Sequence, residues 1–120
     1  MTTLGKNFGE NKPDNLIAKA HPEAQTFGVI IAKGTGVLKR GTVLALNGTT
    51  YSVLASGTTG KANCILADDI DTSDADVTAV CYRAGHFNRK ALIVADGYTM
   101  TLADEEALRN GGIYLSDMAD

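Results

Sequence analysis

Tryptophan is absent from this chain, and the other residues that commonly build catalytic or cofactor sites are scarce. Among 120 residues there are three Phe, four Tyr and two His. Aromatic side chains line most cofactor pockets, and histidine is the side chain most often used for proton transfer near neutral pH. We therefore expect no enzymatic activity and no bound cofactor.

Long apolar runs and an excess of positive charge are also lacking. The longest apolar stretches, such as residues 91–95, hold about five residues, whereas a membrane helix needs roughly twenty. The first residues show no charged-then-apolar signal sequence. Eleven Lys and Arg stand against fourteen Asp and Glu, a net charge of -3, which is unsuited to neutralising phosphates. We expect a soluble protein made in the cytoplasm that binds neither membrane nor nucleic acid.

Cysteine is rare, and its spacing does not predict a metal site. Cys64 and Cys81 both lie in apolar runs, which predicts buried free thiols. Together with His21 and His86 they lack the paired spacing of zinc modules. We expect His86 to be a structural histidine in a turn. The acidic stretch 68–76 lacks the Gly and Glu of a calcium-binding EF-hand loop, so we expect it to be a solvated connection.

Proline occurs only near the N-terminus, at Pro13 and Pro22. Residues 1–26 mix Gly, Asn, Lys and isolated apolar residues without a strand or helix period. A chain of 120 residues is expected to form one domain. We therefore predict a flexible N-terminal arm over 1–26 and a β-rich domain over 27–120.

From Phe27 onward, short β-branched apolar runs alternate with glycine-rich turns. The dipeptide Asn47-Gly48 is typical of a type I′ hairpin turn, and we expect Gly85–Asn88 to form a turn or short strand. The run Arg89–Ala95 fits helix or strand equally. The predicted strands cover residues 27–32, 42–46, 49–54, 63–67, 77–83 and 113–115.

One segment carries the signals of a helix. Thr101 can cap residues 102–110, Asp104 stands at the capping-box position, and Gly111-Gly112 can end the helix. The predicted fold class is mainly β (β-rich α+β), with short strands, hairpins and this one helix.

Three pieces of the chain resemble a known family. KRGTVLA at 39–45, ILADDID at 65–71 and GHFNRKAL at 85–92, in this order and with the apolar runs between them, are similar to the head decoration proteins of tailed bacteriophages, the family of the phage lambda decoration protein. The resemblance covers roughly residues 27–115, and the arm does not align.

The resemblance implies a structural protein that stabilises an expanded phage capsid, on whose outer surface it binds as a homotrimer. The implied partner is the major capsid protein, and the implied locations are the virion and, during assembly, the host cytoplasm. The arm is implied to join strands of the shell. We expect Leu16 and Ile17 to contact the capsid, with the Lys39-Arg40 edge as the other candidate.

Two other classes of function compete with this one. A non-catalytic β-rich module of a phage or cell-surface structure could bind a ligand or carbohydrate, although such modules usually display Trp or Tyr on loops. A small hydrolase or transferase would need a nucleophile and a base that the sequence does not offer.

Overall fold

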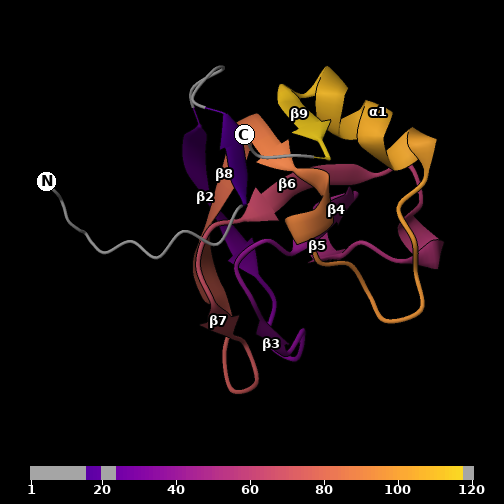
Figure 1. Cartoon of the computed structure of the whole chain (residues 1–120). Coiled ribbons are helices and arrows are strands. Elements are labelled where there is room, and N and C mark those ends of the chain that lie inside the picture. Colours follow the sequence, from indigo (N-terminus) through magenta and orange to yellow (C-terminus); the bar gives the residue numbers. More distant parts are fainter. Residues whose placement is uncertain (1–15, 20–23, 118–120) are drawn as a thin grey trace, which may run out of the picture.

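The computed structural model describes residues 16–19 and 24–117, which form a small domain built mainly from short strands (Figure 1). The predicted fold class is confirmed. The described α-helix is too short to cross a bilayer. In chain order the described elements are β1 (Ile17–Lys19), β2 (Gln25–Ile31), β3 (Val37–Leu38), β4 (Val43–Asn47), β5 (Thr50–Val53), the 3₁₀ helix η1 (Ser56–Thr58), β6 (Ala62–Leu66), β7 (Ile70–Asp71), β8 (Val77–Asn88), the 3₁₀ helix η2 (Arg89–Ala91), α1 (Leu102–Asn110) and β9 (Ile113–Ser116).

The main sheet is organised around β8, because four other strands pair with it. Its first part pairs antiparallel with β2 and β6, and its last part pairs antiparallel with β1 and parallel with β9. The order through the sheet is β1-β8-β6-β4-β5, and β3 and β7 form a separate pair. Segments from both ends of the described chain therefore meet on one strand.

Of the turn or short strand expected at Gly85–Asn88, the turn is wrong: these residues are in a strand, and they continue β8 without a break. Gly85 has a φ of 142°, and a Cβ added there would lie 2.9 Å from the ring of Phe87 and 3.2 Å from the Cα of Ala24. The glycine therefore serves close packing within a strand.

The predicted β4–β5 hairpin is present, but its turn lies one residue later than expected. Asn47 pairs with Thr50, so the two turn residues are Gly48 and Thr49. Gly48 has a φ of 66°, a conformation that glycine adopts without steric cost. The hairpin signal was correct, whereas the residues assigned to the turn were not.

Two hydrophobic cores lie on opposite faces of the sheet. Side chains alternate along a strand, so Val43 and Ala45 of β4 enter the first core and Leu44 enters the second. The first core also receives Leu16, which directly precedes β1, and residues from α1 and β9. Its buried members are Leu16, Val43, Ala45, Leu54, Ala62, Ile65, Phe87, Leu108 and Ile113; those of the second are Val29, Ile31, Leu38, Leu44, Cys64, Leu66, Ala79 and Cys81.

The segment Arg89–Ala95, which the sequence could not assign, is neither a long helix nor a strand. The 3₁₀ turn η2 opens it, where the side chain of Asn88 accepts a hydrogen bond from the N–H of Lys90. Ile93 then makes an isolated parallel bridge to Thr42. This segment leads from the end of β8 across the first core toward α1.

The predicted helix is confirmed with its predicted bounds, Leu102–Asn110. The Thr101 side chain accepts from the N–H of Asp104, and the Asp104 carboxylate accepts from the N–H of Thr101 at 2.9 Å. This reciprocal pair is a capping box, which satisfies donors that the first turn of a helix leaves free.

Asp104 does more than cap the helix, because its carboxylate is fully buried and joins three segments. It accepts hydrogen bonds from the N–H of Gly60 at 2.6 Å and from the Tyr98 hydroxyl. Burial alone would raise the pKa of this carboxyl, but the hydrogen bonds from Thr101, Tyr98 and Gly60 outweigh burial and hold its pKa below the ordinary value.

We predict that Asp104→Asn lowers the free energy of unfolding by about 1–3 kcal/mol, the usual cost of leaving buried hydrogen-bonding groups without partners. Because the folded pKa of Asp104 is depressed, its stabilisation is present above the ordinary Asp range and is lost as the pH falls through the folded pKa. Denaturant titration should therefore show a difference between wild type and variant that shrinks on acidification. Glu106→Gln, on the same helix, is the control; an equal loss in this variant at neutral pH would contradict the prediction.

Candidate functional site

The two arm residues expected to contact a capsid are placed differently. Leu16 is 1% exposed in the first core, and its carbonyl accepts a hydrogen bond from the N–H of Asn88 at 2.7 Å. Ile17 is 39% exposed and pairs with Phe87. Leu16 and β1 thus lie inside the segment predicted as a flexible arm and pack onto the domain. Residues 1–15 lie outside the described residues, and a capsid contact by Leu16 or Ile17 stays a prediction.

The predicted basic edge is also divided between two environments. Arg40 donates from Nη1 to the Tyr82 hydroxyl at 2.7 Å and to the carbonyl of Ala67 at 3.1 Å, and its guanidinium lies 5.5 Å from the centre of the Tyr82 ring. Its backbone N–H donates to Asp69. Lys39 is exposed. Of these two residues, Lys39 has the side chain that is open to an external contact. A capsid contact by either residue stays a prediction.

The structure brings the start of β1 close to the basic edge. A Cβ added at Gly41 would lie 3.7 Å from Cδ1 of Leu16, and Gly41 directly follows Arg40. No local sequence pattern links these two segments. The two predicted contact regions therefore belong to neighbouring parts of the domain.

The acidic stretch 68–76 braces loops. Thr72, which is fully buried, accepts a hydrogen bond from the N–H of Gly36 at 2.7 Å and donates to its carbonyl at 2.9 Å. Asp76 accepts from the N–H of Lys33 at 2.8 Å. Across residues 16–19 and 24–117, no three His, Cys, Asp or Glu residues are grouped as metal ligands would be.

Cys64, Cys81 and His86 all lie in strands of the main sheet. Cys64 and Cys81 are buried and free, which confirms the sequence prediction. A hydrogen bond with Cys81, and then burial, raise the pKa of the Cys64 thiol, whereas the same hydrogen bond lowers the pKa of Cys81. His86 lies in β8, although a turn was expected, and its Nε2 is buried without a hydrogen-bond partner within the described residues.

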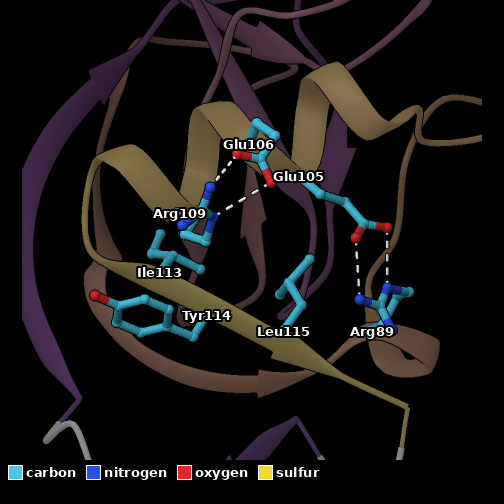
Figure 2. A pocket seen from close by; sticks show the side chains of 7 residues that line it. All are labelled: Arg89, Glu105, Glu106, Arg109, Ile113, Tyr114 and Leu115. Atoms are coloured by element: carbon cyan, nitrogen blue, oxygen red, sulfur yellow. Dashed lines mark hydrogen bonds and ion pairs between the residues drawn. The ribbon is translucent and has the colours of Figure 1, made fainter.

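No sequence motif signals the hollow of about 180 Å³ that lies beside α1 and β9 (Figure 2). Arg89 binds Glu105 at one end through two hydrogen bonds of 2.9 and 3.0 Å and also binds Asp117. Arg109 binds Glu106 on the other side. The lining residues are Arg89, Glu105, Glu106, Arg109, Ile113, Tyr114 and Leu115.

A second hollow, of about 280 Å³, shares Arg89 and Glu105 with the first. Its other lining residues are Leu92, Val94, Tyr98, Thr99 and Met100. The ion pair therefore stands between the two hollows. Each guanidinium in the hollows already has a carboxylate partner: Arg89 joins η2 to Glu105 of α1, and Arg109 pairs with Glu106 within α1.

The described residues thus form a β-rich domain whose polar groups largely brace its own loops. The chain belongs to the bacteriophage lambda head decoration protein D family, whose family model matches residues 6–113. The match confirms the resemblance found in the sequence and extends into the segment that did not align there. This family consists of structural proteins of phage heads, and membership in it associates this chain with the capsid. No curated protein matched the chain.

We predict that Arg89→Met lowers the free energy of unfolding by about 1 kcal/mol, because a bidentate, partly buried pair is worth more than an exposed one. The Arg89 side chain is 35% exposed and that of Glu105 is 24% exposed. Thermal unfolding should show the loss, and a double-mutant cycle with Glu105→Gln should assign it to the pair. Arg109→Met is the matched control, because it removes the exposed pair that Arg109 forms with Glu106 within α1. A larger effect in the control would refute this ranking of the two pairs.

Proposed function

We propose that this protein binds as a homotrimer to the outer surface of an expanded phage capsid and stabilises it by contacting the major capsid protein. The observation that carries the proposal is the match of residues 6–113 to the head decoration family. The protein would reach the virion from the host cytoplasm during assembly. A binding protein of this kind needs complementary surfaces and no catalytic groups.

An uncharged surface on β2 and β8 supports association with other chains. Ile30 is 65% exposed and Val80 is 42% exposed. The register places Gly28 opposite Val80 and Ile30 opposite Thr78, so these side chains share one face. Exposed apolar side chains grouped in this way are typical of surfaces that bind other proteins.

The segment that precedes Leu16 supports a second point of attachment. The family match begins ten residues before Leu16, and Leu16 itself is fixed in the core. We infer that residues 1–15 contact the shell, where an extended segment can add a strand to an exposed sheet edge. Leu16 would then fix this segment to the domain.

The alternative of a carbohydrate-binding module has less support. Tyr114, 43% exposed, is the one aromatic among the exposed large apolar side chains of the described residues. The charged groups beside it in the first hollow are paired with each other. Neither feature provides a stacking platform with free hydrogen-bonding groups.

We predict that removing residues 1–15 leaves the domain folded and lowers its affinity for expanded, undecorated heads by about tenfold or more, equivalent to about 1.4 kcal/mol of lost contacts. Thermal unfolding checks the fold, and co-sedimentation with heads checks attachment. Truncation through residue 20 should in addition destabilise the domain, because it removes Leu16. Attachment of the shorter truncation at the wild-type level would place the contact elsewhere, with Lys39→Ala as the next variant.

We also predict that the protein is trimeric, either in solution or once bound to the shell. Association would bury the apolar face of β2 and β8. Sedimentation of the free protein and a reconstruction of decorated heads together measure both states. Ile30→Asp should weaken trimer formation more than Thr78→Asp, because Ile30 offers more apolar surface. Monomers in solution and on the shell would contradict the prediction.

A further inference from the structure

The Asn47-Gly48 dipeptide at the tip of the β4–β5 hairpin has chemistry that the structural role does not use. Asn47, Gly48 and the nearby Lys61 are all exposed. Gly48 has no side chain to shield its backbone nitrogen, and within the described part of the chain its N–H has no backbone hydrogen-bond partner. The nitrogen of Gly48 is therefore available near the side-chain amide of Asn47.

We propose that Asn47 is a site of spontaneous deamidation, in which the backbone nitrogen of Gly48 displaces ammonia from the Asn47 side chain. A bond forms between this nitrogen and Cγ of Asn47, and the bond between Cγ and the side-chain nitrogen breaks. The proton from the Gly48 nitrogen leaves with the ammonia. Water then opens the resulting succinimide at either carbonyl, giving aspartate or isoaspartate. This proposal is independent of the capsid role.

Lys61 is placed to assist the reaction. Its Nζ donates a hydrogen bond to Oδ1 of Asn47 at 3.0 Å, and the carbonyl of Lys61 accepts from the N–H of Leu46 at 3.1 Å. Oδ1 acquires negative charge when Cγ is attacked, and a nearby cation stabilises such charge. The ammonium therefore favours attack and would afterwards pair with an aspartate product.

The chain contains a second Asn-Gly dipeptide, Asn110-Gly111, which provides an internal control. Asn110 is the last residue of α1, and the N–H of Gly111 donates to the carbonyl of Leu108 at 3.0 Å. Attack by this nitrogen requires the hydrogen bond to break and the last turn of the helix to open. The structure thus exposes one dipeptide to reaction and protects the other.

The test is to incubate the purified full chain at mildly alkaline pH and follow deamidation by mass spectrometry with an isoaspartate assay. Cleavage after Lys and Arg separates the two sites into fragments 41–61 and 110–120. We expect Asn47 to react about tenfold faster than Asn110 in the folded protein, a difference of about 1.4 kcal/mol in barrier. In denaturant the two rates should converge, because both sites share the same dipeptide.

Equal rates in the folded protein, or faster reaction at Asn110, would overturn the proposal. A rate difference that persists in denaturant would show that the fold is not its cause, and would overturn it equally.

The role of Lys61 is tested by Lys61→Met, with Lys90→Met as an exposed control. The first variant should slow reaction at Asn47 about two- to fivefold, the range that corresponds to an exposed charge interaction, and the second should leave it unchanged. Thermal unfolding of both variants checks that the hairpin is retained. An unchanged or faster rate in Lys61→Met would rule out assistance by Lys61.

Discussion

Hydrogen bonding to β8 is the constraint on which the rest of this structure depends. This twelve-residue strand pairs with β1, β2, β6 and β9, so segments distant in the chain must align with it in register. A shift by one residue would exchange the buried and exposed faces of the strand. Gly85 and Phe87 show how closely it is packed, since a Cβ at Gly85 would meet the Phe87 ring. Both cores are built around this strand.

Polar side chains stabilise the loops that do not pair with β8. The Asp104 carboxylate joins the start of α1 to Gly60 and Tyr98, and Thr72 joins the loop at Gly36 to the acidic stretch. Arg89 connects the end of β8 to α1. A domain of this size buries a modest core, so such buried or bidentate contacts contribute substantially to a single native arrangement.

Some side chains of the domain contact other parts of the same chain, and others are open to solvent. This difference bears on the proposed attachment to a capsid. Arg40 contacts Tyr82 and Asp69, whereas Lys39 and the β2–β8 face around Ile30 are open to solvent. Leu16 belongs to the core, so in the proposed role it would fix the preceding residues to the domain. In the proposed role, a small rigid body would thus carry separate surfaces for the shell and for neighbouring copies.

The sequence by itself determined the fold class, the buried thiols and the bounds of α1, because strand periodicity, glycine turns and the Thr101–Asp104 capping box are local signals. The family followed from the resemblance of three sequence pieces to known decoration proteins. It misplaced the hairpin turn by one residue and divided β8 at Gly85, since a glycine in a turn and a glycine in a packed strand read alike. Only the tertiary structure decided that Leu16 is buried, that Arg40 contacts Tyr82 and that Arg89 meets Glu105. These contacts join segments far apart in the chain, so their geometry is set by strand register and packing, which no local pattern records.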